Sequence, residues 1–236
     1  QELARGGVSI SSLGGQVRNP YDLTRSPGGS SGGTAAALAA NFAVLGAGSD
    51  TGQSIRSPAS ACSLVGVRPT RGLVSRAGVM PNSFTQDEIG PIARTVKDAA
   101  YLLDVMVGYD AQDPITALGV GKPPASYAKA LDAKALRGAR IGVMANLYGK
   151  DARHAEVNRV MEQVIRTMEG QGATIVRFEV PGYDQLAGAV GTDRYEARAA
   201  FDKYFAELGP QAPVTSFRQL VDTRTVALLQ AARLVE

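Results

Sequence analysis

The sequence of 236 residues has one cysteine, one histidine and no tryptophan. A single cysteine excludes an internal disulfide framework and a zinc site built from clustered cysteines. Cys62 lies in the apolar stretch 61–67, where we expect it to be a buried core residue. The lone histidine, His154, precedes a predicted helix, where we expect a surface role. A Ser-His-Asp triad would have to use it, and no nucleophile in a tight turn is near. We therefore expect chemistry without histidine, metal or cofactor.

Long apolar runs are also missing. A membrane span needs about 18 apolar residues, and the best candidate, residues 34–48, is shorter and interrupted by Asn41. Residues 1–5 have no basic start followed by an apolar stretch, so we expect no signal peptide. With the lone cysteine, this favours a cytoplasmic location and no membrane partner. The first residue is not Met, and we expect the chain to be a piece of a longer protein.

The excess of positive over negative charge is small. Lys and Arg number 25 and Asp and Glu 22, which gives a formal net charge of +3, too small to favour a nucleic-acid partner. Hydrophobic residues make up 44% of the chain, enough to bury a core. The 27 glycines favour loops in which the backbone approaches a ligand closely.

Apolar periodicity predicts alternating helices and strands. Helices are expected over residues 34–41, 54–62, 95–107, 154–170, 195–208 and 217–235, and strands over residues 42–48, 140–145 and 174–180. The strand–helix–strand order of the last two strands predicts an α/β fold with a partly parallel sheet. The buried side of its helix is expected to carry Val157, Val160, Met161, Val164, Ile165 and Met168.

Two Gly/Ser segments stand where helices begin. Residues 28–33 (GGSSGG) precede one helix, and residues 50–56 (DTGQSIR) follow a strand and open another. Helix N-termini favour negative charge by up to about 2 kcal/mol, and a serine after a tight turn can expose its hydroxyl. The backbone N–H groups that would face a developing oxyanion are those of Thr51, Gly52, Gln53 and Ser54. Taken alone, each segment is also typical of an ordinary turn.

The order of several motifs is more specific than either segment. The motifs are residues 15–22 (GQVRNPYD), 28–33 (GGSSGG), 48–58 (GSDTGQSIRSP), 64–76 (LVGVRPTRGLVSR) and 86–103 (QDEIGPIARTVKDAAYLL). With these motifs the chain resembles the amidase signature family, strongly over residues 1–110 and more weakly beyond. The resemblance implies an α/β fold with a mixed, largely parallel, twisted central sheet covered by helices on both faces. It also implies one incomplete domain over 1–236, with a motif-bearing catalytic core over 1–110 and a helical and βαβ part over 125–236 that contributes to the substrate pocket.

The resemblance further implies a Ser–cisSer–Lys triad that hydrolyses amides through an acyl-enzyme. By position, Ser54 matches the nucleophile, and Ser30 matches the bridging serine that follows a cis peptide bond. The oxyanion and substrate-binding loop corresponds to Thr51, Gly52 and Gln53. The positions that support this loop correspond to Ser31, Asp50 and Arg56.

The chain departs from the family pattern in two places. The family's catalytic Lys lies upstream of the GGSSGG motif, whereas the first lysine here is Lys97, on a helix that we expect to be structural. The Lys therefore has to come from a segment before Gln1, or this polypeptide is inactive as it stands. Gln53 also replaces the usual glycine, which restricts φ and adds a polar group beside the nucleophile.

Several functions remain open on the sequence. The leading hypothesis is an amidohydrolase that acts on a small-molecule amide. The second is a protein like the A subunit of a glutamine-dependent amidotransferase, and the third is a non-catalytic amidase-like scaffold. Dinucleotide binding after the strand 42–48 fails, because Pro58 falls where a long helix should continue and no acidic residue ends a second strand about 20 residues on. A homodimer stays open, and so does the identity of the amide.

Overall fold

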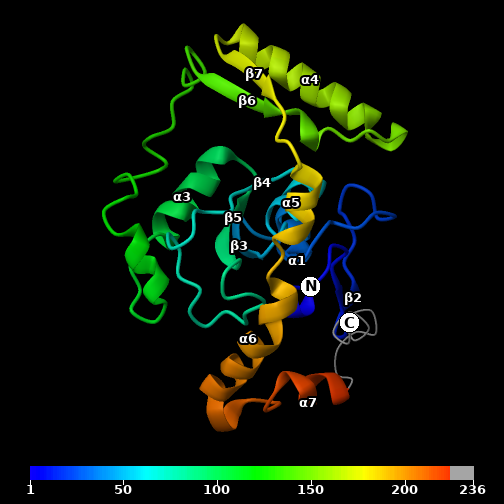
Figure 1. Ribbon diagram of the computed structural model, residues 1–236, viewed down its shortest axis with the longest axis vertical. Coiled ribbons are helices and arrows are strands. Elements are labelled where there is room, and N and C mark those ends of the chain that lie inside the picture. Colours follow the sequence, from blue (N-terminus) through cyan, green and yellow to red (C-terminus); the bar gives the residue numbers. More distant parts are fainter. Residues whose placement is uncertain (224–236) are drawn as a thin grey trace. The chain divides into compact units, whose positions relative to one another are not determined.

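The computed structural model describes residues 1–223 (Figure 1). The chain divides into two compact units. The first, which we name the motif unit, comprises Gln1–Lys129 and the segment from Thr192 onward. The second, which we name the βαβ unit, comprises Ala130–Gly191. The expectation of one incomplete domain with a motif-bearing core over 1–110 stays a prediction.

The motif unit is built on a three-stranded sheet in the order β3 (Leu45–Asp50), β5 (Glu88–Ala93) and β4 (Val65–Gly66). The central strand β5 is antiparallel to both neighbours and is mostly buried. A Cβ atom on Gly90 would lie only 2.1 Å from the carbonyl oxygen of Val67, so only glycine allows the chain to pass this close. A separate short ribbon pairs β1 (Ile10–Ser11) with β2 (Gly15–Gln16).

Strand direction in this sheet differs from the expectation. The mixed α/β class is confirmed, but the motif-bearing sheet is antiparallel rather than largely parallel. Strands β3 and β4 do run in the same direction, because the helix between them, α2 (Arg56–Ala61), carries the chain back before β4 begins. The irregular segment 67–87 then turns the chain back. As a result, β5 lies between β3 and β4 and runs in the opposite direction to both. Sequence periodicity contains no information about this insertion.

The helices next to the sheet form close to where the sequence predicts them. They are α1 (Gly32–Ala39), α2 and α3 (Val96–Met106), and the side chain of Thr95 caps α3 by accepting a hydrogen bond from the Asp98 N–H. The strand predicted from residue 42 begins only at Leu45. Phe42 is 84% exposed, because α1 ends just before Asn41, which has a positive φ of 62°, and the chain turns there.

The core of the motif unit lies where α1 and α2 meet the sheet. Leu38 of α1, Ile55 and Ala59 of the α2 region, and Ile92 of β5 form one buried cluster. Cys62 is fully buried, as expected, and burial raises the pKa of its thiol. The cluster fixes the start of α2, and with it the loop that follows β3.

A second core lies on α6 (Asp193–Leu208), which is followed by α7 (Phe217–Asp222). Phe201 is fully buried, and its ring centroid lies 6.2 Å from that of Phe205 and 5.3 Å from that of Phe217. The helix predicted from residue 217 to 235 is observed as far as Asp222, and its part from residue 224 onward lies outside the described residues.

The βαβ unit confirms the predicted strand–helix–strand order. Strands β6 (Arg140–Met144) and β7 (Thr174–Phe178) pair in parallel, from Arg140 opposite Thr174 to Met144 opposite Phe178. Helix α4 (Ala155–Gly170) connects them, and His154 stands directly before it. Helix α5 (Tyr183–Ala189), which the sequence analysis misses, follows β7.

The predicted buried side of α4 is only partly buried. Ile165 is 3% exposed, but Val157, Val160, Met161 and Val164 are exposed. Two strands make a sheet that is too narrow to cover a helix of 16 residues. The helical periodicity is therefore confirmed, and the extent of burial is wrong.

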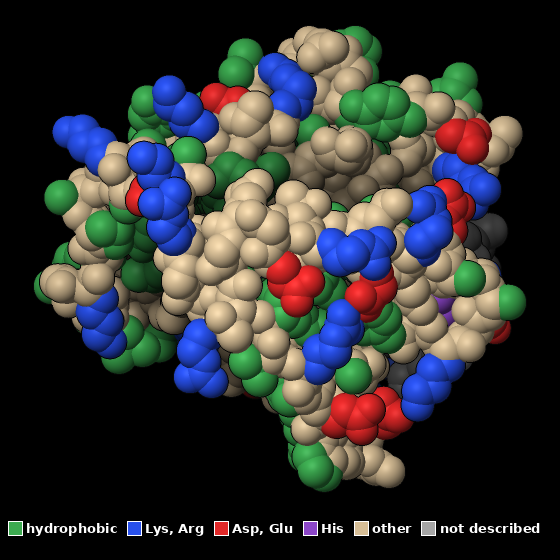
Figure 2. All heavy atoms as spheres, turned by 90° about the horizontal axis from the view of Figure 1, so that it is seen from above, with side chains coloured by type: hydrophobic (Ala, Val, Ile, Leu, Met, Phe, Trp, Pro, Cys, Tyr) green, Lys and Arg blue, Asp and Glu red, His purple; other side chains and the backbone are tan. Residues whose placement is uncertain are grey.

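The surface carries charges of both signs. On the face drawn in Figure 2, Lys and Arg side chains are spread among acidic and hydrophobic ones rather than gathered in one patch. No helix within residues 1–223 is both long enough and apolar enough to cross a membrane.

We expect Phe201→Ala to destabilise the fold, since it removes a fully buried ring and leaves a cavity. The free energy of unfolding should fall by about 3–5 kcal/mol, measured by urea denaturation. Phe42→Ala makes the same chemical change at a site 84% exposed and should change stability little. Equal losses in the two variants would contradict the second core around α6.

Candidate functional site

The segment before α1 carries Ser30. The Gly29–Ser30 peptide bond is cis, as expected from the resemblance. A Cβ atom on Gly29 would lie 3.0 Å from the carbonyl oxygen of Gly6, so glycine is needed where the two backbones pass. Ser30 is 2% exposed. The hydroxyl of buried Ser9 donates to the carbonyl of Gly28 at 2.7 Å and helps to fix this segment.

The segment before α2 carries Ser54, which is 6% exposed. The two serine-bearing segments meet through their backbones, where the N–H of Ser31 donates to the carbonyl oxygen of Ser54 at 3.1 Å. Within residues 1–223, no hydrogen bond joins the hydroxyls of Ser30 and Ser54. The structure thus brings the two segments together, and the relay between the hydroxyls stays a prediction.

Ser31 ties the first segment to the sheet. Its hydroxyl lies 3.2 Å from both the N–H and the carbonyl oxygen of Ser49 in β3. A Cβ atom on Gly48 would lie 2.8 Å from this hydroxyl, so the glycine of the strand leaves the room that Ser31 occupies. Ser31 therefore positions the backbone that carries Ser30.

Asp50 organises the second segment. Its carboxylate is fully buried and accepts hydrogen bonds from the Ile55 N–H at 3.0 Å and from Arg56 Nε at 3.1 Å. Arg68 Nε lies 3.5 Å from its other oxygen. The hydrogen bond with Asp50 raises the pKa of Arg56, and Arg56 also donates to the carbonyl of Gly52. A buried carboxylate is stable only with such partners. The hydrogen bonds and ion pairs of Asp50 therefore fix the loop between β3 and α2.

Thr51, in the same loop, is fixed by hydrogen bonds to Asn82 and Asp87. Its hydroxyl donates to Asp87 Oδ1 at 2.6 Å, and the Asn82 side chain donates to the Thr51 hydroxyl at 3.3 Å. The remaining oxygen of Asp87 accepts from the N–H groups of Asn82 at 2.7 Å and Ser83 at 2.8 Å.

Gly52 and Gln53 lie at the exposed tip of the loop. A Cβ atom on Gly52 would meet open space, and the Gln53 amide nitrogen would lie 3.0 Å from a Cβ atom on Gly7. Within residues 1–223, the backbone N–H groups of Gly52, Gln53 and Ser54 donate to no protein acceptor. Backbone N–H groups without a protein acceptor are the kind of donor that oxyanion sites use.

Sequence reasoning missed Arg68, Asn82, Ser83 and Asp87. Arg68 and Asp87 stand inside the quoted motifs, but nothing in their spacing shows that they contact the segment 50–56. Asn82 and Ser83 lie in an irregular stretch without periodicity. Only the folded chain brings these polar side chains to the loop.

Glu88 is a further buried carboxyl beside this network. It lies opposite Asp50 in the sheet and is 1% exposed, and neither of its oxygens has a hydrogen-bond partner in the described part of the chain. Burial raises its pKa, although Arg68 and Arg76 act in the opposite direction.

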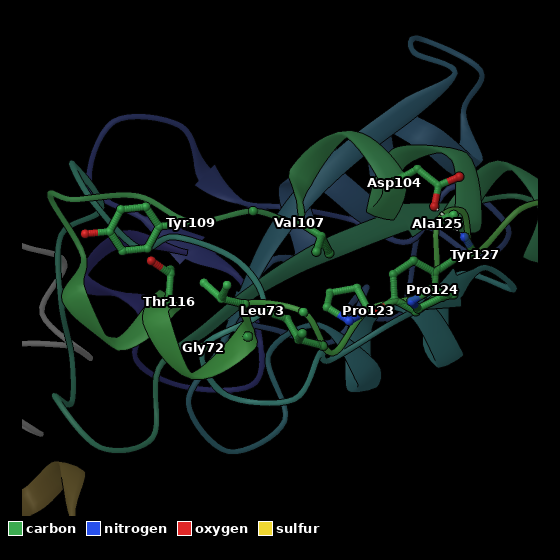
Figure 3. Close-up of a pocket in the computed structure, with 14 residues that line it drawn as sticks. Gly72, Leu73, Asp104, Val107, Tyr109, Thr116, Pro123, Pro124, Ala125 and Tyr127 are labelled. Atoms are coloured by element: carbon green, nitrogen blue, oxygen red, sulfur yellow. Dashed lines mark hydrogen bonds between the residues drawn. The ribbon is translucent and has the colours of Figure 1, made fainter.

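Two adjoining hollows of the motif unit are both lined by Ser49, and one of them is also lined by Ser30. One of about 320 Å³ is lined by Ser30, Ser31 and Ser49. The other, of about 540 Å³, also includes Ser49 and extends past Asp87 to α6. A third hollow of about 380 Å³ lies elsewhere in the motif unit, where Asp104 binds the segment 126–128 (Figure 3), and no predicted site residue lines it.

Lys97, the first lysine of the chain, lies on α3, and its ammonium is 5.8 Å from the ring centroid of Tyr101. Over residues 1–223, no three His, Cys, Asp or Glu side chains gather as metal ligands would. The described residues thus offer two serines, a supported loop of N–H donors and open space beside Ser30.

Comparisons with known proteins identify the family of the chain. The family model described as Amidase matches residues 1–231. The A subunit of glutamyl-tRNA(Gln) amidotransferase from Acinetobacter baylyi is 44% identical over 195 residues, which cover 80% of this chain and 39% of that protein.

Among solved structures, the peptide amidase of Stenotrophomonas maltophilia superimposes with a TM-score of 0.83 at 37% identity, covering 98% of this chain and 47% of the other. The A subunit of glutamyl-tRNA(Gln) amidotransferase from Thermotoga maritima superimposes with a TM-score of 0.67 at 35% identity, covering 93% of this chain and 46% of the other. The chain spans about two fifths of the length of the curated relatives it matches. On the family match and on the superposition, the chain belongs to the amidase signature family.

Proposed function

We propose that the protein to which this chain belongs cleaves a carboxylic amide through an acyl-enzyme on Ser54. The observation that carries the proposal is the meeting of the two serine segments at the Ser31–Ser54 backbone hydrogen bond, beside N–H groups that have no acceptor within residues 1–223. Membership of the amidase signature family supports it. The base is a Lys from a segment outside this chain.

In the proposed mechanism, the neutral Lys takes a proton from the Ser30 hydroxyl. Ser30 takes the proton of Ser54, whose oxygen attacks the amide carbonyl. The N–H groups of Gly52, Gln53 and Ser54 stabilise the oxyanion, and each such donor is worth about 3–4 kcal/mol. The proton returns along the relay to the leaving amine, and water hydrolyses the ester to the acid and free Ser54.

The peptide amidase and the amidotransferase subunit, to which the chain is similar, differ in the substrates that their names state. The structural match is better with a peptide amidase, and the sequence match is higher with the A subunit of an amidotransferase. We propose hydrolysis of an amide as the main activity, with small peptide amides as the first substrates to test. A cytoplasmic location, expected from the lone cysteine, belongs to the same proposal.

The second candidate is a component of an amidotransferase, favoured by the 44% identity to the Acinetobacter baylyi protein. As a hydrolase, the protein should release ammonia from peptide amides without any other protein. As an amidotransferase component, it should be purified with partner proteins and should depend on glutamine. Assaying ammonia release from both kinds of substrate, with and without copurified proteins, separates the two.

The nucleophile assignment predicts the behaviour of Ser54→Ala in the longer polypeptide. A fluorophosphonate probe should label the wild-type protein at Ser54, and the variant should not react. Its kcat should fall by at least about 10³-fold, because the variant lacks the hydroxyl proposed to form the acyl-enzyme. Ser60→Ala changes an exposed serine of α2 and should retain labelling and rate. An unlabelled wild-type protein would instead support the non-catalytic scaffold.

The supporting role of Asp50 predicts a double effect for Asp50→Asn. The change leaves Arg56 and Arg68 beside a neutral amide, which should lower the free energy of unfolding by about 3 kcal/mol. It should also slow fluorophosphonate labelling at temperatures where the variant is fully folded. Asp22→Asn alters an exposed ion pair and should change neither quantity. Unchanged labelling in folded Asp50→Asn would remove Asp50 from the proposed support.

A further inference from the structure

The irregular segment 82–87 connects two parts of the motif unit that are far apart in sequence. On one side it contacts Thr51 in the proposed oxyanion loop, and on the other it contacts the first turn of α6. Its residues Asn82, Ser83 and Asp87 are all buried. A buried polar segment keeps one conformation only when its hydrogen bonds are made, so both ends of this connection help to fix it.

Ser83 stands in the middle of the connection. It is 1% exposed. Its N–H donates to Asp87 Oδ2 at 2.8 Å, while its hydroxyl donates to Glu196 Oε2 at 2.5 Å. The same residue thus binds the carboxylate that holds Thr51 and the carboxylate that belongs to α6.

Glu196 makes most of the contacts on the helix side. Its carboxylate also accepts from the Thr85 N–H at 3.0 Å and from the Thr85 hydroxyl at 2.9 Å. Burial alone would raise the pKa of Glu196, but the hydrogen bonds from Ser83 and Thr85 outweigh it and hold the pKa below its usual value. Thr192, just before α6, adds a hydrogen bond from its N–H to Gln86 Oε1 at 3.0 Å.

The chain of contacts therefore runs from Glu196 through Ser83 and Asp87 to Thr51. Thr51 directly precedes Gly52, whose N–H is one of the free donors at the loop tip in the described part of the chain. The hollow that extends from Ser49 to α6 is lined by Ser83 and Asp87, the two middle residues of this chain of contacts. A substrate that lies there would touch α6 and the segment 82–87 together.

We propose that Glu196 is a positioning residue that holds the oxyanion loop in place through Ser83, Asp87 and Thr51. This inference rests on the proposed function of the loop. Glu196 touches no reacting atom in it, and its effect is on the placement of the Gly52 and Gln53 N–H groups. Small misplacements of such groups slow catalysis strongly.

The test measures kinetics of Glu196→Ala in the longer polypeptide that contains this chain, with a small peptide amide as substrate. We expect kcat to fall roughly 10- to 100-fold with little change in KM, because the loss lies in transition-state stabilisation. Fluorophosphonate labelling of Ser54 should slow by a similar factor. Glu196→Gln should restore most of the rate, since its carbonyl oxygen accepts from Ser83 and its amide donates to the Thr85 hydroxyl.

Asp222→Ala is the matched control, because it removes a carboxylate from α7, where the side chain is 55% exposed, pairs with Arg218 and lines none of the hollows described above. It should keep the wild-type rate. A double-mutant cycle with Thr51→Ala tests the route, and the two losses should be less than additive. Fully additive losses, or a Glu196→Ala variant that is folded and labelled at the wild-type rate, would overturn the inference. Failure to label Ser54 in the wild-type protein would overturn the proposed function instead.

Discussion

The buried Asp50 carboxylate is the interaction on which the rest of the site depends. It ends β3, receives the N–H groups that begin α2, and balances its charge with the guanidinium groups of Arg56 and Arg68. Without this anion, the two cations Arg56 and Arg68 would face each other at the loop between β3 and α2. The carboxylate thereby converts a glycine-containing loop into a fixed set of N–H donors. This ordering is achieved before any substrate arrives, which is the condition for efficient electrostatic stabilisation.

Glycine provides the space in which this arrangement fits. Gly48 leaves room for the Ser31 hydroxyl, Gly90 lets the segment at Val67 cross β5, and Gly29 allows the backbone of residues 6–7 to pass. Any other residue at these positions would bring its Cβ atom to within about 3 Å of a neighbour, a distance that real Cβ atoms rarely show. The high glycine content of the chain therefore reflects close packing of backbones around the two serines as well as flexible turns.

How much the sequence could reveal depends on whether a feature is local. The helices around Leu38 and Leu103, the parallel pair β6 and β7, and burial of Cys62 follow from local composition and periodicity, and all are observed. The insertion of β5 between β3 and β4 does not follow from any local pattern, because strand order is a property of the whole chain. The exposed side of α4 shows the same limit, since periodicity identifies an apolar stripe but not the area available to cover it. The contacts of Asn82 and Ser83 are between polar residues without any repeat, and only the fold brings them together.

Two sets of residues support the loop that carries the proposed nucleophile. One set lies within the sequence motifs, and the other lies outside them. Asp50, Arg56 and Arg68 belong to the motif-bearing segments and act below the loop. Glu196 lies in the region where the resemblance is weak, yet it reaches the loop through Ser83 and Asp87. The proposed chemical step can thus be coupled to a helix that lies outside the motif-bearing segments. Because α6 also lines the hollow beside Ser49, we expect changes on this helix to alter both the shape of the hollow and the placement of the proposed oxyanion donors.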